Sequence, residues 1–277
     1  MSRDPRNMLA RPDLAARSLE GLTAAGAYAD PTPMTAVVAS ASLRAAPDAD
    51  AEQVDQVLFG ETFEVLAAAD GFCWGQARRD GYVGFVARAD LASLAPAPTH
   101  RVSAIRTYGF KDASIKSRAL GPYSLGALIA VEAREGRFVK AANSGWFVEA
   151  HLSPIGVFES DVVAVAERYL GAPYLWGGRE SLGLDCSGLV QQALLACGQA
   201  CPRDTDQQAL MGRPVQAEAL LRGDLVFWRG HVAIMLDSQA ILHANAHHMA
   251  TAIEPLADAV TRIGATNTGQ PTGYRRL

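Results

Sequence analysis

A cysteine and two histidines have the types and the setting that nucleophilic catalysis requires. Cys186 lies in the sequence LGLDCSGLVQQ, where a helix is predicted to begin at or next to the cysteine. The unpaired amides and the positive dipole of a helix N-terminus stabilise a thiolate, and the same amides can later face an oxyanion. A cysteine nucleophile also needs an imidazole that takes its proton and then protonates the leaving amine. We therefore expect Cys186 to be a nucleophile rather than an inert cysteine on a helix face.

His231 and His243 are the histidines that fit this role. His231 opens the run HVAIML after the Arg229-Gly230 turn, and His243 lies in the next run, AILHAN. A three-residue loop centred on Asp237 would put the two histidines directly opposite one another, with Cβ atoms about 4.5–5.5 Å apart. One imidazole can then act as a base while the other orients it. A two-residue loop would instead send them to opposite faces of the hairpin.

Neighbouring polar residues offer alternative roles. Asn245 is a second candidate for orienting the base, although it lies two residues further along the strand. His247 and His248 follow the expected end of this strand, and we expect them at the surface. His243 and His247 could bind a metal ion together with His231, but no carboxylate or thiol stands at metal-ligand spacing. No metal site is predicted.

The composition is that of a globular protein with a small acidic excess. The chain has 277 residues, with 25 Lys+Arg against 29 Asp+Glu, a net charge of −4 and 49% hydrophobic residues. These values exclude a disordered protein and argue against binding nucleic acid through a general basic field. The 4 cysteines are too few for a disulfide framework in a chain of this length, so we expect buried thiols.

No stretch of the sequence has the features of a membrane span or a secretion signal. None reaches about 18 apolar residues. The N-terminal sequence MSRDPRNMLARPDLAARSLEG carries charges throughout and lacks the apolar core of a signal peptide. We expect no membrane partner and a cytoplasmic location.

The character of the sequence changes twice, which predicts a multidomain protein. Residues 1–34 are rich in Ala, Arg, Asp and Pro and are expected to be an extension with a short helix at 14–22. Short alternating strands separated by Gly and Asp turns follow in residues 35–95. The same plan recurs about 60 residues later, in residues 96–155, as in a duplicated module. We predict two small all-β barrels in tandem.

Residues 156–277 combine helices with strands in an α+β layout. One helix is predicted to start with Ser160 as its N-cap and to end at Gly171, and a second to run from Cys186 to Gly198. Strands are predicted at 224–228, 231–236, 239–245 and 273–277. The predicted fold class is therefore multidomain, with two small all-β barrels followed by an α+β domain.

Four motifs, in this order, resemble those of the NlpC-type papain-like cysteine peptidases that carry two N-terminal bacterial Src-homology-3-like domains. The motifs are PYLWGGRESLGLDCSGLVQ, PRDTDQQA, GDLVFWRGHVAIML and ILHAN. The resemblance covers residues 35–277 and implies that 156–277 form the papain-like catalytic domain. It implies an endopeptidase that needs no cofactor and cuts the γ-D-glutamyl-L-diamino-acid bond of murein peptides such as L-Ala-γ-D-Glu-diaminopimelate.

The resemblance also implies a role for individual residues. Cys186 becomes the nucleophile, His231 the base and His243 the third member, which orients the base. The positions that line the subsites for L-Ala and D-Glu are matched by Trp176, Asp185, Ser187, Asp204 and Thr205. The threonine stands where the family often has serine, so the hydroxyl is kept and a methyl group is added.

In this subfamily the first barrel helps to close the cleft and holds the free amine of L-Ala, which implies roles for Glu52 and Tyr82. A buried ammonium group needs a carboxylate partner, which Asp185, Asp204 or Glu52 could supply. Glu52 could equally be a solvated acid, and Tyr82 a core aromatic residue. Selectivity for a free amine would exclude intact murein, where muramic acid occupies that nitrogen, and favours recycling of released fragments.

Two other functions stay open at this point. The same site could serve an amidase or acyltransferase on another substrate, because a fold does not fix the reaction. Alternatively, the chain could be a non-catalytic binder of wall peptides, although all three catalytic positions carry competent residues. The third residue of the peptide, diaminopimelate or lysine, is also left open.

Overall fold

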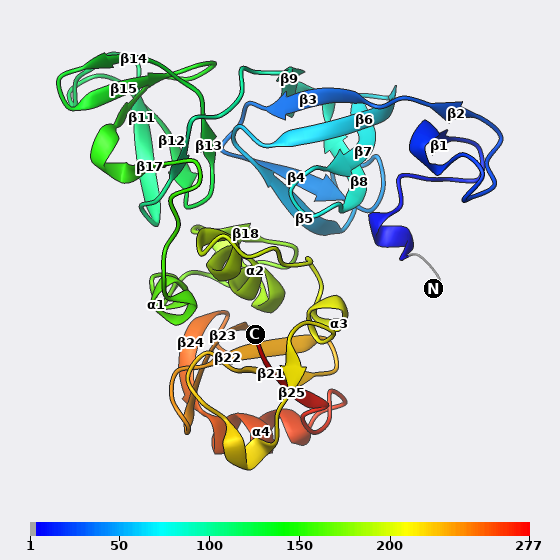
Figure 1. Cartoon of the computed structure of the whole chain (residues 1–277), viewed down its shortest axis with the longest axis vertical. Helices are drawn as coiled ribbons and strands as arrows, with labels where there is room; N and C mark the ends of the chain where they lie inside the picture. The colour runs from blue at the N-terminus through cyan, green and yellow to red at the C-terminus, as the bar shows by residue number, and fades with distance from the viewer. Residues whose placement is uncertain (1–3) are drawn as a thin grey trace. The chain divides into compact units, whose positions relative to one another are not determined.

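The computed structural model describes residues 4–277, and the chain divides into two compact units (Figure 1). The first unit ends at Ile155 and consists mainly of strands, whereas the second begins at Gly156 and combines helices with a six-stranded sheet. The predicted multidomain α+β architecture is confirmed, while the division of the first unit at residues 34 and 95 stays a prediction. No helix within residues 4–277 is long and apolar enough to cross a membrane.

The N-terminal segment packs on the first β region and does not form the helix predicted at 14–22. It consists of short 3-10 helices and two paired strands, which are Pro5–Asn7, β1 (Ala15–Ala16), Arg17–Leu19 and β2 (Tyr28–Ala29). The helix prediction is wrong because the amide of Ala16 donates to the carbonyl of Leu9 (2.9 Å) rather than to a carbonyl one turn earlier. Leu9 and Ala16 then pack against Trp74 in one apolar cluster.

The first β region is a seven-stranded antiparallel sheet with a single core. Its strands are β3 (Thr32–Ala36), β4 (Ser40–Arg44), β5 (Gln53–Leu58), β6 (Thr62–Ala69), β7 (Phe72–Ala77), β8 (Val83–Ala87) and β9 (Leu91–Ser93), in the order β5-β4-β8-β7-β6-β3-β9. Between β6 and β7, Asp70 and Gly71 both have positive φ (51° and 82°), which is typical of a tight two-residue hairpin turn. Buried side chains such as Leu43, Phe63 and Val86 form the core.

The second β region has its own core and two smaller sheets. Its strands are β10 (His100–Val102), β11 (Arg106–Phe110), β12 (Ala119–Ser124), β13 (Leu128–Ile129), β14 (Val131–Glu135), β15 (Phe138–Ala141), β16 (Trp146–Val148) and β17 (Leu152–Pro154). They form a sheet in the order β12-β11-β16-β15-β14 and a second in the order β13-β10-β17. That this region is a second barrel of the Src-homology-3 type stays a prediction.

Two neighbouring residues connect these β regions within the first unit. Phe59 packs with the core of the second region, its ring centroid 4.9 Å from that of Tyr123. Gly60 follows with a positive φ of 78°, and any side chain there would clash with the carbonyl of Leu128. The amide of Leu128 in turn donates to Phe59 (2.8 Å), so the two regions pack closely at this point.

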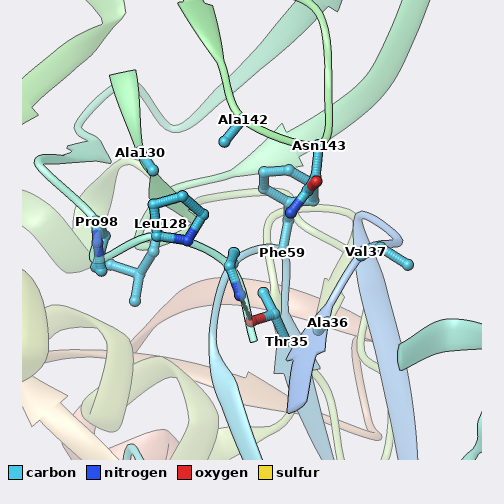
Figure 2. Close-up of a pocket in the computed structure, with 12 residues that line it drawn as sticks. Thr35, Ala36, Val37, Phe59, Pro98, Leu128, Ala130, Ala142 and Asn143 are labelled. Carbon is cyan, nitrogen blue, oxygen red and sulfur yellow. Dashed lines mark hydrogen bonds between the residues drawn. The ribbon is translucent and has the colours of Figure 1, made fainter. Parts of the chain in front are cut away.

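A narrow pocket lies between the two β regions (Figure 2). Thr35 and Phe59 line it from the first region, and Leu128, Ala130 and Asn143 line it from the second. Its volume is about 20 Å³, close to what a single water molecule needs. The pocket is therefore too small for a peptide.

The second unit is built on an antiparallel sheet and two contacting helices. The sheet contains β20 (Arg213–Pro214), β21 (Leu225–Trp228), β22 (His231–Met235), β23 (Ala240–Asn245), β24 (Ala250–Pro255) and β25 (Gly273–Arg276), in the order β20-β25-β21-β22-β23-β24. The helices α1 (Val162–Glu167) and α2 (Cys186–Ala196) contact one another, and α2 also contacts β22 and β23. All residues of α2 except Leu195 are buried, so the helix is held firmly within this unit.

Several elements of this unit differ from the predictions. The N-cap of α1 is Asp161 rather than Ser160, because the Asp161 carboxylate accepts hydrogen bonds from two amides of the first turn. Sequence analysis did not anticipate the short strands β18 (Arg179–Glu180) and β19 (Gly183–Leu184), the helix α3 (Thr205–Gln208), β24, or the helix α4 (Leu256–Gly264). These elements complete the surroundings of the predicted site.

Candidate active site

Cys186 is the first residue of α2, as the sequence predicts. Asp185 is the N-cap, and its carboxylate accepts a hydrogen bond from the amide of Gly188 (2.8 Å). Gly188 has to be a glycine because a Cβ there would clash with the carbonyl oxygen of Gly178. The Asp-Cys-Ser-Gly sequence thus places the cysteine at the positive end of an eleven-residue helix.

The thiol of Cys186 lies beside the start of β22. Its Sγ donates to the carbonyl oxygen of Gly230 (3.9 Å), and the backbone amides of Val232 and Ser187 act to lower the pKa of the thiol. Gly230 and Val232 flank His231 in the chain. The fold therefore brings the predicted nucleophile and the predicted base together from two elements distant in sequence.

A hydrogen-bonded chain runs from His231 to Arg262. His231 Nε2 lies 2.9 Å from His243 Nδ1, and His243 Nε2 lies 3.1 Å from an oxygen of Glu254. Arg262 binds both oxygens of the same carboxylate, through Nε (3.0 Å) and Nη2 (2.5 Å). Asn245, the alternative orienting residue, donates to the carbonyl of His243 instead. Sequence analysis missed Glu254 and Arg262.

The strand register differs from the one predicted for the two histidines. Ile234 pairs with Leu242, so His231 and His243 are diagonal neighbours on one face rather than directly opposite. The turn is centred on Ser238 rather than on Asp237, because the amide of Leu236 donates to the carbonyl of Ala240 (2.8 Å). Asp237 Oδ1 accepts from the amides of Gln239 (2.7 Å) and Ala240 (2.9 Å) within this turn. Both histidines still lie on the same face of the sheet, and their rings are close enough for a hydrogen bond between diagonal positions.

This chain of hydrogen bonds fixes the tautomers of both imidazoles. Burial alone would raise the pKa of Glu254, but the hydrogen bonds and charge of Arg262 outweigh it and hold that pKa below its usual value. An ionised carboxylate only accepts, so His243 must donate from Nε2 and accept at Nδ1. His231 then donates from Nε2, which leaves its Nδ1 unprotonated. The base therefore has a free lone pair with which to take a proton.

Burial favours the neutral forms of the thiol and of both imidazoles. Burial, followed by the charge of Asp185, raises the pKa of Cys186 to about 12. Burial lowers the pKa of His231 to about 3 and that of His243 to about 4. The loss of solvation thus opposes the stabilisation of a thiolate by the helix amides, and the stabilised thiolate stays a prediction.

A buried ion pair holds the start of α2. Arg203 is 1% exposed and binds both oxygens of Asp185 (2.9 and 2.7 Å) as well as the hydroxyl of Ser187 (2.8 Å). Asp185 also accepts from the amide of Gly177 (2.9 Å). Since its carboxylate is already bound on both oxygens, Asp185 has little capacity left for a substrate ammonium group. Asp204 and Glu52 remain as the predicted carboxylates for that ammonium group. Sequence analysis missed Arg203.

The other predicted substrate-binding residues of this unit lie in a turn and at the start of a short helix. Trp176 is 57% exposed in the turn that precedes Gly177. Asp204 is the N-cap of α3, and Thr205 is the first residue of that helix. Tyr174, which sequence analysis did not single out, lines a pocket together with His231, and burial raises its pKa above the ordinary value.

Glu52 and Tyr82 belong to the first unit. Glu52 is exposed just before β5. Tyr82 is 6% exposed and packs in the core of the first β region, which counts against a role in binding a substrate. The role of Glu52 stays a prediction from the resemblance.

Among residues 4–277, one group of side chains has the geometry to hold a metal ion. The potential ligand atoms of His243, His248 and Glu254 lie within 4.8 Å of one another. Arg262 already occupies the Glu254 carboxylate, and Asn245 Oδ1 lies 3.0 Å from His248 Nδ1. Because a cation and polar partners already occupy this group, we assign no metal to it.

Known proteins match both units of the chain. The profile of the NlpC/P60 family matches residues 171–262, and that of the bacterial dipeptidyl-peptidase SH3 domain matches residues 43–91. Dipeptidyl-peptidase 6 of Lysinibacillus sphaericus is 28% identical over 241 residues, covering 76% of this chain and 88% of that protein. The γ-D-glutamyl-L-lysine dipeptidyl-peptidase of Bacillus subtilis is 28% identical over 212 residues, covering 68% and 71%.

A solved structure has the same fold. The crystal structure of an NlpC/P60 family protein from Bacillus cereus superposes with a TM-score of 0.75 at 18% identity, covering 88% of this chain and 99% of the other. This likeness concerns the fold alone, whereas the sequence profiles identify the domains. The chain therefore contains an NlpC/P60 domain and, before it, a bacterial dipeptidyl-peptidase SH3 domain.

Proposed function

We propose that the chain is a cysteine endopeptidase that hydrolyses the γ-D-glutamyl-L-diamino-acid bond of murein peptides with a free N-terminal L-Ala. The observation that carries the proposal is the thiol of Cys186 at a helix N-terminus, next to a strand whose His231 is oriented by His243. Both relatives are named dipeptidyl-peptidases, which supports a peptidase, and the name of the second, which gives a γ-D-glutamyl-L-lysine bond, supports the class of substrate.

The geometry supports a two-step reaction. Sγ of Cys186 attacks the γ-carbonyl carbon of D-Glu while His231 Nδ1 takes the thiol proton, and amides at the start of α2 face the developing oxyanion. His231 then gives this proton to the leaving amine as the C–N bond breaks. A water molecule, deprotonated by His231, hydrolyses the thioester and restores the thiol. His243 keeps the second ring nitrogen of His231 protonated throughout.

The substrate is expected to be a released fragment rather than intact murein. A carboxylate such as Asp204 or Glu52 would bind the free ammonium group of L-Ala, which is blocked in intact murein. This selectivity would suit recycling of wall fragments in the cytoplasm. The second β region would then be a spacer of the Src-homology-3 type without a ligand of its own.

Product analysis by mass spectrometry tests the proposal. The purified protein is incubated with L-Ala-γ-D-Glu-diaminopimelate and with the same peptide acetylated at its amine, and Cys186→Ala is the control. We expect cleavage of the free peptide only, and none by the variant. Cleavage of both peptides would refute amine selectivity. Cleavage of neither would refute the peptidase and favour an amidase or acyltransferase with another substrate.

A further inference from the structure

A pocket opens beside His231 within the second unit. Its volume is about 360 Å³, and its lining includes Tyr174, His231, Arg229 and Arg262. The walls come from the residues around the start of β22, the end of β23 and the C-terminal part of α4. No residue of α2, where the nucleophile lies, belongs to the lining.

The position of this pocket identifies the part of the substrate that it can hold. In the proposed function, on which this inference rests, His231 protonates the amine of the departing diamino acid. The departing residue must therefore lie against His231 when the C–N bond breaks. A pocket that shares His231 but none of α2 is thus on the leaving-group side of the scissile bond.

The charge of the pocket lining is positive. Arg229 and Arg262 line it, whereas no Asp or Glu does. Arg229 is exposed and forms no salt bridge within the described part of the chain, and its Nη2 donates only to the carbonyl of Asn267. Arg262 turns Nε and Nη2 towards Glu254. An anion would find an arginine without a charged partner here, whereas an ammonium group would meet only cations and neutral dipoles.

We propose that this pocket binds a carboxylate of the departing diamino acid, with Arg229 as its charged partner. A planar guanidinium group suits this task because it can donate two parallel hydrogen bonds to one carboxylate. Diaminopimelate offers two such groups, the α-carboxylate and the carboxylate at the end of its side chain. Lysine offers the α-carboxylate alone, because its side chain ends in the same ammonium group as that of diaminopimelate but lacks the carboxylate beside it.

Four peptides of the form L-Ala-γ-D-Glu-X separate the two carboxylates. X is diaminopimelate or lysine, each as the free acid and as the α-amide, and kcat/KM is measured for the full chain and for Arg229→Gln. Removing the carboxylate that binds should lower kcat/KM about tenfold, as expected for a charged hydrogen bond. If kcat/KM falls when the α-carboxylate is amidated, the pocket binds the α-carboxylate. If kcat/KM falls when diaminopimelate is replaced by lysine, the pocket binds the side-chain carboxylate. In Arg229→Gln this discrimination should disappear.

Arg213→Gln is the matched control, because Arg213 is an exposed arginine of the same unit that does not line the pocket. It should retain the discrimination of the unchanged chain. Cleavage of all four peptides at similar kcat/KM, or equal discrimination in Arg229→Gln, would overturn the inference alone. Absence of cleavage of every peptide would overturn the proposed function and this inference with it.

Discussion

Two arginine–carboxylate pairs lie behind the two reacting groups, and they differ in what they hold. Asp185 and Arg203 are both nearly inaccessible, with side chains 9% and 1% exposed, and they bind the first turn of α2. Glu254 and Arg262 are more accessible, with side chains 11% and 27% exposed, and Glu254 binds the ring of His243. One pair fixes a backbone, whereas the other fixes the protons of two imidazoles.

The difference indicates that the same chemical pair serves stability at one place and reactivity at the other. A fully buried ion pair is costly to leave half-formed, because the remaining charge has no solvent and no partner. The second pair differs in its arginine: the Arg262 side chain is 27% exposed, so water can solvate its charge when Glu254 is removed. Damage to the first pair should therefore change the free energy of unfolding, and damage to the second should change the rate and its dependence on pH.

The largest expected effect is that of Arg203→Met. The substitution removes the charge beside Asp185 and leaves that carboxylate buried and unpaired, which should lower the free energy of unfolding by about 3–5 kcal/mol. Urea denaturation followed by circular dichroism measures it. Arg168→Gln breaks the surface pair with Glu159 in the same unit and should cost less than about 1 kcal/mol. Equal losses in the two variants would contradict the structural role of Arg203.

Glu254 is expected to act on the rate. Glu254→Ala removes the acceptor for His243 Nε2, so the tautomer of both imidazoles is no longer fixed, and kcat should fall about 10–100-fold. Glu254→Gln keeps a carbonyl oxygen as acceptor and should recover part of this loss. Steady-state kinetics on the murein tripeptide measures both variants.

The pH profile separates this role from a merely structural one. The charge of Glu254 raises the pKa values of His231 and His243. Its removal in Glu254→Gln should therefore move the acidic limb of kcat/KM to lower pH. An unchanged limb together with a lower kcat would mean that Glu254 only supports the fold.

The sequence predicted where Cys186, His231 and His243 lie in the fold because local rules govern these positions. A helix start at Cys186 follows from the Gly and Asp residues around it, and the shared face of His231 and His243 follows from the two-residue period of a strand. The register was wrong by two residues, since the turn is centred on Ser238 rather than on Asp237, whose side chain accepts hydrogen bonds from the amides that follow it. A register shift of two residues leaves both histidines on the same face of the sheet, so the contact between them did not depend on the exact register.

The two arginines could not be predicted in the same way. Arg203 is a single basic residue in a loop, and its burial depends on Asp185, which lies 18 positions earlier in the chain. Glu254 and Arg262 required β24 and α4, which sequence analysis did not anticipate. A signal for α4 was present, because Leu256, Ala259, Val260 and Ile263 recur at helical spacing and pack on the sheet.

The smallest expected effect concerns the stability cost of keeping His243 neutral. Burial lowers its pKa to about 4, from an ordinary value of 6.5. Below pH 6.5 the unfolded chain binds a proton there that the folded chain does not bind, so stability falls as the pH falls towards 4. Between pH 6 and pH 5 this single group should remove about 1 kcal/mol from the free energy of unfolding.

Urea denaturation of the chain and of His243→Gln at pH 6 and pH 5 measures this contribution. The glutamine cannot bind a proton, so the variant should lose about 1 kcal/mol less than the unchanged chain over this interval. His247→Gln is the control, since this exposed histidine lies outside the hydrogen-bonded chain of the site, and its loss should match that of the unchanged chain. If His243→Gln kept the full pH dependence, His243 would be protonated in the folded state. The carboxylate of Glu254 would then neutralise a charge rather than select a tautomer.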